Sequence, residues 1–448
     1  MERQRWRLAR IIALTVTIVI GAVISYRAVY AEHPQRRIDR AAADVATIRQ
    51  LSFKAPVRAS RQSREEFLVF AEGELDRGNL PRDFGKIARA LGYYSGPEIE
   101  DFRAVFRRLL VAGAGGYYDS YRKAVFIVRE MPEPRRTLTY AHESYHALQD
   151  QHFDLKAYLL DPTRNGTLNG DEALARQAVV EGEATYVGLM HSVFELHGRV
   201  PDARTMKPIV EAQRSIARAD VRDALKGPKG AAIFGKAAVE DLKQLEDVPS
   251  FLLESFAGVY LIGVTFVHSI HSVGGWQEVE KLYRQNPPIS TEQILHPEKW
   301  QIGEAPVRIE WPSFAAESLF ADWSVLDENV LGEFSWRILF NQNGLAAEAE
   351  EAASGWGGDR YAILEREDTG ETLVLIRSTW DTEADAQHFA ATYRRLLEHK
   401  RMSRPLQAVV SERGRDVTII EGSGTSGVDH FLRFAEGASV AHPTAQTP

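Results

Sequence analysis

The chain has 448 residues, a formal net charge of −8 and no cysteine. Its length suggests two or three domains, and a hydrophobic content of 44% excludes a disordered or fibrous chain. Because 62 acidic residues outnumber 54 basic ones, nucleic acid is not expected as a partner. The lack of cysteine excludes thiol catalysis, disulfides and thiolate metal sites, so a metal site must use His, Asp and Glu.

The first 31 residues are expected to direct export. Four arginines precede Ile11, and residues 11–26 carry no charge. This pattern favours an uncleaved signal anchor in the cell membrane, with a cytoplasmic N-terminus and the remaining chain outside the cytoplasm. A cleavable signal peptide that releases the protein is the alternative, because Val29 and Ala31 suit a cleavage site, although Arg27 does not.

Residues 32–136 are predicted to form helices and two short strands. A capping box at Ser63 and Glu66 marks one helix start, and Pro81 and Pro97 are expected to begin the next two helices. The expected helices cover residues 38–51, 63–76, 81–91 and 97–110. The expected strands cover residues 117–118 and 124–128, joined by a turn.

The chain is predicted to continue as helices to residue 284 and to become richer in strands after about residue 307. The very apolar segment 251–271 ends at Gly274-Gly275, and Glu254 and His268 favour a core helix over a second membrane span. Residues 290–297 are expected to form a loop. Further helices are expected at residues 137–152, 171–197, 203–247, 276–284 and 382–397, and strands at residues 361–366, 372–379 and 417–421.

These elements predict an α+β, mostly helical fold. The expected parts are the N-terminal signal (1–31), a domain with a small sheet (32–325), a smaller α+β domain (326–434) and a disordered tail (435–448).

The pentapeptide His142-Glu-Ser-Tyr-His146 carries the clearest chemistry. Residues four apart lie on one face of a helix, so the imidazoles of His142 and His146 could bind one ion. Zinc lowers the pKa of a bound water, and Glu143 could take the proton. The alternative is an accidental pair of histidines on a surface helix, which the apolar residues of the same segment disfavour.

A catalytic zinc usually has three protein ligands and one open position. Glu181 and Glu183 lie on the next long helix, among apolar neighbours. Their side chains point to different faces, so at most one of them is expected to bind the metal. A buried carboxylate needs a cation or hydrogen bonds, and zinc would supply the cation. A solvated surface glutamate is the alternative for each.

The two segments, His142-Glu-Ser-Tyr-His146 and Glu181-Gly-Glu-Ala-Thr185, resemble the gluzincin group of zinc metallopeptidases. In that group the third ligand opens an ExxxD pattern on a second helix. The resemblance therefore implies a zincin-like domain in which His142, His146 and Glu181 bind one Zn²⁺ ion.

Thr185 stands where the gluzincin group has an Asp that supports the first histidine. Asp150 or Glu183 could replace that Asp. Zincins also place a strand at a sheet edge beside the substrate cleft, so we expect strand 124–128 at an edge, where a peptide could bind by strand addition.

Longer segments resemble a little-characterised group of bacterial exported or membrane-bound metallopeptidases. These segments are residues 142–155 and 290–300, together with Gly274-Gly-Trp276 and Gly355-Trp-Gly-Gly-Asp359. This similarity spans roughly residues 40–400 and implies no particular substrate.

Enzymes of this kind stabilise the oxyanion with the metal and a Tyr or His donor. Tyr260, on the apolar helix, and His296, in the predicted loop 290–297, are the two candidates. The alternative for Tyr260 is a core aromatic residue, and the alternative for His296 is a turn residue.

Together these features predict a membrane-tethered, extracytoplasmic zinc metallopeptidase that acts on a peptide or protein substrate. One alternative is an inactive zincin scaffold in envelope protein assembly, which the intact Glu143 disfavours. The other is a zinc hydrolase of a non-peptide amide.

Overall fold

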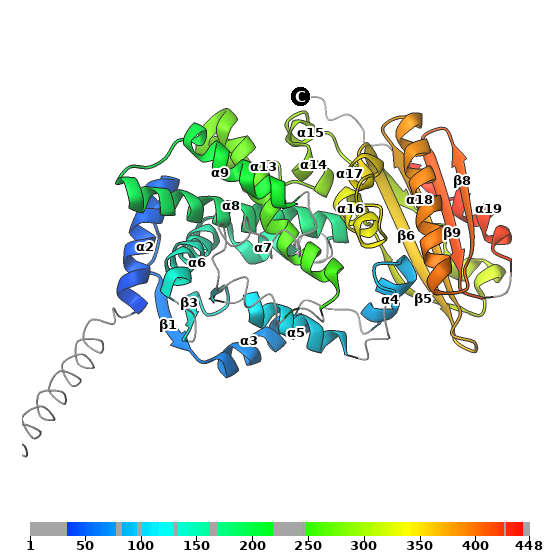
Figure 1. Cartoon of the computed structure of the whole chain (residues 1–448), viewed down its shortest axis with the longest axis horizontal. Coiled ribbons are helices and arrows are strands. Elements are labelled where there is room, and N and C mark those ends of the chain that lie inside the picture. Colours follow the sequence, from blue (N-terminus) through cyan, green and yellow to red (C-terminus); the bar gives the residue numbers. More distant parts are fainter. Residues whose placement is uncertain are drawn as a thin grey trace, which may run out of the picture.

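The computed structural model describes residues 34–77, 83–95, 101–113, 115–129, 133–160, 168–217, 245, 248–424 and 427–441. The predicted signal segment, residues 218–244 of the predicted helical stretch, and residues 442–448 of the predicted tail lie outside the described residues. The fold is α+β and mostly helical, as predicted. Helices form one half of the molecule, and a larger sheet lies in the other half (Figure 1).

The helical half is built around α8 (Gly170–His197), which packs against α13 (Ser250–Arg284) and α6 (Glu133–Phe153). Apolar residues of all three helices form its main core, together with those of neighbouring helices. The neighbouring helices are α2 (Pro34–Arg49), α5 (Phe102–Gly113), α7 (Leu155–Leu160) and α9 (Ala203–Ala217).

Helices α8 and α13 approach closely because each has a glycine at the crossing. A Cβ on Gly182 would lie 2.2 Å from the carbonyl carbon of Gly263, and a Cβ on Gly263 would lie 2.0 Å from the carbonyl oxygen of Ala178. No side chain fits in either position, so this contact requires glycine.

Helix α13 is kinked at Gly274 and Gly275, whose backbone angles are not helical, where the sequence predicted a break. Among the described residues it is the one helix that is long and apolar enough to cross a membrane. However, 67% of its most apolar window is buried inside the molecule, as expected for a core helix.

A three-stranded sheet lies beside α6, in the order β1 (Arg58–Gln62), β3 (Ala124–Val128), β2 (Gly116–Asp119). The prediction that strand 124–128 lies at an edge is wrong, because β3 pairs with β1 on one side and β2 on the other. The sequence of β1, Arg-Ala-Ser-Arg-Gln, is too polar to have indicated a strand. The edge nearest α6 therefore belongs to β2.

Helix α3 (Arg64–Arg77) follows β1 and begins with the predicted capping box. The Ser63 backbone N–H donates to Glu66 Oε2 (2.7 Å), and the Glu66 N–H donates to Ser63 Oγ (3.2 Å). Helix α4 (Phe84–Leu91) lies farther along the chain and packs against the C-terminal half.

Two short helices, α14 (Thr291–Leu295) and α15 (Pro297–Gln301), replace the loop predicted at residues 290–297. The hydroxyl of Ser290 accepts a hydrogen bond from the Gln293 N–H and so caps α14. Sequence patterns miss such five-residue helices because they span little more than one turn.

The C-terminal half contains a five-stranded antiparallel sheet in the order β5-β6-β7-β9-β8. Its strands are β5 (Trp323–Asn329), β6 (Trp356–Arg366), β7 (Thr372–Trp380), β8 (Gln407–Arg413) and β9 (Asp416–Gly422). The helices of this half are α16 (Gly332–Gln342), α17 (Ala349–Ala353), α18 (Glu383–Ser403) and α19 (Leu432–Glu436). Short 3₁₀ turns are η2 (Phe314–Ala316), η3 (Ser318–Phe320) and η4 (Asp429–Phe431).

The predicted domain boundary lies close to the start of a strand, and the predicted tail is partly ordered. Residue 325 lies inside β5, which begins at Trp323. The tail is not disordered over residues 435–441, because α19 continues to Glu436 and β10 (Ser439–Ala441) pairs with β4 (Arg308–Glu310). This pairing joins segments some 130 residues apart, which local composition does not reveal.

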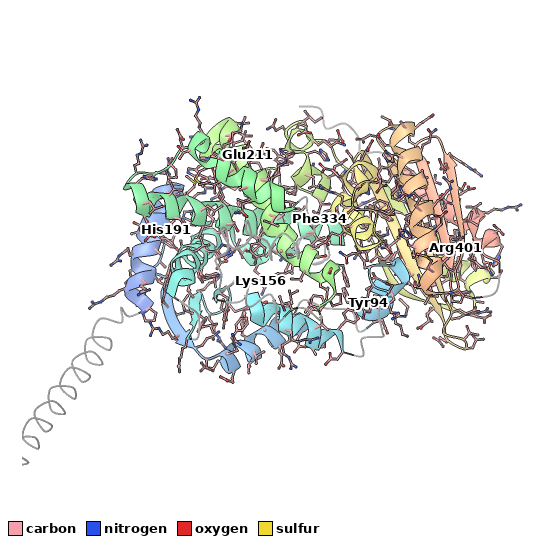
Figure 2. The ribbon with its side chains drawn as sticks, in the orientation of Figure 1. Tyr94, Lys156, His191, Glu211, Phe334 and Arg401 are labelled. Atoms are coloured by element: carbon pink, nitrogen blue, oxygen red, sulfur yellow. The ribbon has the colours of Figure 1, made fainter. Side chains whose placement is uncertain are left out.

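Phe334 of α16 lies between the two halves of the molecule (Figure 2). Its ring packs on Gly258 of α13 so closely that a Cβ there would lie 2.3 Å from Phe334 Cζ. The two halves are therefore in direct contact through apolar packing.

Candidate metal centre

The first two candidate ligands project from one face of α6. An adjoining face of this helix is buried through Ala141, Tyr145 and Leu148, each fully inaccessible. Packing thus turns His142 and His146 towards α8, and their Nε2 atoms lie 3.0 Å apart. Their rings are nearly perpendicular, with an interplanar angle of 88°.

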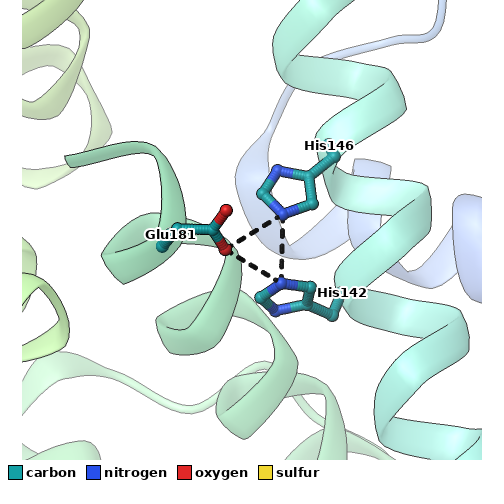
Figure 3. A group of neighbouring side chains, drawn as sticks. All are labelled: His142, His146 and Glu181. Atoms are coloured by element: carbon teal, nitrogen blue, oxygen red, sulfur yellow. Dashed lines mark hydrogen bonds and ion pairs between the residues drawn. The ribbon is translucent and has the colours of Figure 1, made fainter. Parts of the chain in front are cut away.

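Glu181 comes from α8 and completes a cluster of three. Its Oε2 atom lies 3.4 Å from His142 Nε2 and 3.3 Å from His146 Nε2 (Figure 3). The adjacent Gly182 allows α13 to pack closely against this turn of α8. The three ligand atoms thus converge from two helices, and Figure 3 shows both imidazoles facing the carboxylate.

The donor set fits a zinc ion. Three donors bound at roughly 2.0–2.1 Å with tetrahedral angles lie about 3.3 Å from one another, and the three distances here are 3.0, 3.3 and 3.4 Å. Glu181 Oε2 is buried and has no hydrogen-bond partner within the described part of the chain. A cation between the three atoms would satisfy this oxygen.

Charges within the cluster shift the pKa values of its residues. Burial alone would lower the pKa of His146, but the charge of Glu181 outweighs it and raises that pKa to about 9. Burial alone would raise the pKa of Glu181, but the two imidazoles hold it far below its usual value. The carboxylate is therefore ionised and attracts positive charge at this point.

Glu143 lies beside the cluster and is buried, with 8% of its surface exposed. Burial raises its pKa, while His142 and His146 lower it. The backbone N–H of Tyr118, on β2, also lowers the pKa of Glu143. The candidate general base therefore lies between the ligands and the edge strand of the small sheet.

Of the two candidate oxyanion donors, the structure brings only Tyr260 to the cluster. Its ring stacks on that of His142 at a centroid distance of 6.2 Å. Burial raises the pKa of Tyr260 well above its usual value, and the charges of Glu181 and Glu143 raise it further. The hydroxyl therefore keeps its proton and remains a hydrogen-bond donor.

His296 is not part of this cluster. Its Nε2 atom lies 3.0 Å from the carboxylate of Glu333 on α16, and its Nδ1 atom lies 3.7 Å from Glu298. The hydrogen bond to Glu333 raises the pKa of His296. Its contacts agree with the alternative of a structural residue near a helix end.

The three residues predicted to support the ligands occupy different places. Asp150 accepts hydrogen bonds from the Tyr118 hydroxyl and the Lys123 ammonium group, both at 2.6 Å, and so ties the β2–β3 hairpin to α6. Thr185 lies one turn after Glu181, and no hydrogen bond joins it to either histidine within the described residues. Only Glu183 lies behind the cluster, fully buried.

Gln149 is a residue of the site that sequence reasoning missed. Its Oε1 atom lies 2.8 Å from His146 Nδ1, and its Nε2 atom lies 3.2 Å from Glu183 Oε2. Gln149 follows His146 by three residues on a predicted helix, and residues three apart are neighbours on a helix surface. This spacing could have indicated the contact.

Comparison with known proteins found a similarity in a part of the chain that does not contain the candidate metal ligands. A family described as "Domain of unknown function (DUF8575)" matches residues 322–431. No curated protein and no solved structure matches the chain. The matched segment contains the five-stranded sheet and lies outside the helices that carry the metal ligands.

Proposed function

We propose that this chain is a zinc-dependent metallopeptidase, in which His142, His146 and Glu181 hold one Zn²⁺ ion. One observation carries this proposal: two imidazoles and a buried carboxylate oxygen converge on one point beside Glu143. Each imidazole can bind a metal in its neutral form, and the carboxylate oxygen has no hydrogen-bond partner among the described residues. When bound, zinc acts as a Lewis acid that polarises a carbonyl and lowers the pKa of a coordinated water.

The residues of the chain then have separate tasks in hydrolysis. Glu143 takes the proton from the attacking water and passes it to the leaving amine. Tyr260 donates its hydroxyl proton in a hydrogen bond to the developing oxyanion, since its raised pKa keeps it protonated. The burial of Glu143 limits its contact with bulk water and strengthens both interactions.

The position of β2 supports a peptide as the substrate. It is the edge strand of its sheet, and its Tyr118 backbone N–H is close enough to Glu143 to lower the pKa of that carboxylate. An extended peptide that adds to this edge would pass beside the general base. Strand addition by β2 replaces the role that the sequence had suggested for β3.

The test is metal content together with a peptide-library digest of the purified protein. We expect about one zinc per chain and cleavage that stops on chelation and returns with zinc. Zinc without any cleavage would favour an inactive scaffold or a hydrolase of a non-peptide amide. A chain that binds no zinc would overturn the proposal.

We also propose that the catalytic part lies outside the cytoplasm, tethered to the cell membrane. The four arginines before the uncharged segment 11–26 support this orientation. Reporter fusions after Glu32 should be active only with a reporter that works outside the cytoplasm. Activity of a cytoplasmic reporter would contradict the orientation.

A further inference from the structure

A chain of buried polar groups lies behind the metal centre and joins four helices. Gln149 of α6 contacts Glu183 of α8, which accepts hydrogen bonds from Arg49 Nε at the end of α2 (2.8 Å) and from the Tyr283 hydroxyl of α13 (2.6 Å). Glu183 and Gln149 are fully inaccessible, and Arg49 is 1% exposed. A carboxylate and a guanidinium buried together need defined hydrogen bonds, so their geometry is constrained.

The hydrogen-bond partners determine which way the Gln149 amide points. Its Nε2 atom lies 2.8 Å from the Tyr283 hydroxyl oxygen, 3.1 Å from the carbonyl oxygen of Val180 and 3.2 Å from a carboxylate oxygen of Glu183. The Tyr283 hydroxyl donates its own proton to Glu183, and the other two partners are acceptors only, so the group that faces all three must be the donating NH₂. The amide oxygen must then face His146.

The orientation of the amide in turn determines the tautomer of His146. Gln149 Oε1 lies 2.8 Å from His146 Nδ1 and can only accept. His146 Nδ1 must therefore carry a proton. In the neutral ring, the lone pair is then on Nε2, the atom that faces Glu181 and His142.

Arg49 is the last of these buried polar groups, farthest from His146. Its Nε atom also lies 3.0 Å from the Tyr145 hydroxyl, and its guanidinium stacks on the Trp276 ring at 4.6 Å. The indole N–H of Trp276 donates to the Ile48 carbonyl at 2.8 Å. These contacts dock the end of α2 and fix the carboxylate that orients Gln149.

We propose that Gln149 is a positioning residue that holds His146 in its Nδ1–H tautomer, and that Glu183 and Arg49 fix Gln149 in that orientation. This inference rests on the proposed function, because it concerns a ligand of the proposed zinc ion. The sequence suggested that Glu183 supports the first histidine directly. Glu183 instead acts on the second histidine, through Gln149.

The first test is zinc affinity in a matched pair of variants of the full chain. Gln149→Met keeps the length of the side chain and removes its hydrogen bonds. We expect it to weaken zinc binding about 10–100-fold, the usual effect of removing a group that orients a metal-bound histidine. Gln151→Met is the control, because Gln151 lies on the same helix and, among the described residues, hydrogen-bonds only the backbone of Lys54 and Ala55. Its zinc affinity should stay within a few-fold of wild type.

The second test is the tautomer of His146 in the metal-free wild-type protein. ¹⁵N NMR of labelled histidines, assigned with a His146→Asn variant and recorded at a pH where His146 is neutral, should show the proton on Nδ1. In Gln149→Met the two tautomers should both be populated. This measurement applies even if Gln149→Met fails to fold, since it needs only the wild type and the assignment variant.

Four results would overturn the inference or separate it from the function. Unchanged zinc affinity in Gln149→Met, or an Nε2–H tautomer in the metal-free wild type, would overturn it. Equal losses in Gln149→Met and Gln151→Met would also overturn it, because general destabilisation would then explain both. If the wild type binds no zinc, the proposed function fails, and the NMR tautomer still decides whether Gln149 positions His146.

Discussion

Two places in the described part of the chain bring three potential metal ligands together, and they differ in which groups face the carboxylates. One is the cluster of His142, His146 and Glu181. The other consists of Glu292, Glu304 and Asp381, near α14 and α15. In the second cluster Lys299 Nζ lies 2.6 Å from each of the three carboxylates.

The chain thus supplies its own cation to the second cluster. An ammonium group has three donors, and here each meets one carboxylate. In the first cluster the groups that face Glu181 Oε2 are two imidazoles, and no lysine or arginine pairs with it among the residues that the structure describes. Convergence of acidic groups therefore does not predict a metal by itself; the proposed zinc site differs because its imidazoles, unlike a lysine, can give up a proton and bind a metal.

The largest expected effect concerns Glu143. Glu143→Gln keeps the shape of the side chain but removes the proton acceptor, so peptide hydrolysis should fall by roughly 10²–10⁴-fold or more. Zinc content should stay near one per chain. Glu292→Gln, the same substitution in the Lys299 cluster, is the control and should leave turnover nearly unchanged. Hydrolysis by Glu143→Gln at the wild-type rate would remove Glu143 from the mechanism.

The Lys299 cluster can be broken by removing its cation. Lys299→Met would leave Glu292, which is 2% exposed, without a counter-charge. Removing one partner of a buried pair costs up to about 3–5 kcal/mol, and denaturant unfolding would measure the loss. Proton uptake by Glu292 limits this loss, because burial raises the pKa of Glu292 to about 8. Lys281→Met is the control, because Lys281 pairs with Glu278 at the surface, where a pair contributes about 0–1 kcal/mol. Equal losses in both variants would mean that the Lys299 cluster is not a structural ion group.

Metal removal should distinguish the two clusters directly. Zinc at 100 times its dissociation constant should stabilise the wild type by about 2.7 kcal/mol, which chelation should abolish. Glu181→Ala should lose most of this stabilisation, since it lacks an anionic ligand, whereas Glu304→Ala should retain it. Thermal unfolding with and without chelator gives the comparison. Undiminished zinc binding by Glu181→Ala would place the third ligand elsewhere.

The smallest expected effect concerns the helix crossing next to the proposed zinc site. Gly182→Ala puts a methyl group into the backbone of α13 and should destabilise the protein by about 1–3 kcal/mol, despite the better helix propensity of alanine. Gly188→Ala is the control on the same helix, because its Cβ would meet only the flexible Leu138 side chain at 3.1 Å. Denaturant unfolding should show that Gly182→Ala loses more than twice as much stability as Gly188→Ala, or that Gly188→Ala gains stability. A Gly182→Ala protein as stable as Gly188→Ala would show that α13 can move away.

Local patterns in the sequence were sufficient for much of the fold. The long helices α6, α8 and α13, the break at Gly274-Gly275 and the Ser63 capping box all follow from periodicity, glycine and cap chemistry over a few residues. The polar strand β1 and the late strand β10 could not be predicted, because their pairing partners are far away in the chain. The edge position of β2 depends on β1 and was missed with it.

The candidate site divides in the same way. The i, i+4 spacing of His142 and His146 on a helix was sufficient to predict that they share a face. The choice between Glu181 and Glu183 depended on which face of α8 meets α6, and only helix packing decides this. The choice between Tyr260 and His296 likewise depended on the route of α13, which the Gly182–Gly263 contact brings against α8.

The sequence by itself determined the chemistry that is available: two histidines and a glutamate at helical spacing, no thiol, and a second glutamate-bearing helix. Only the tertiary structure decided which carboxylate meets the imidazoles, that Gln149 orients His146, and that Lys299 neutralises the other acidic cluster. The physical reason is the distance along the chain between the residues that interact. Spacing along a helix is set by bonds between neighbouring residues, whereas the pairing of a charge with a cation depends on packing between segments far apart in the chain.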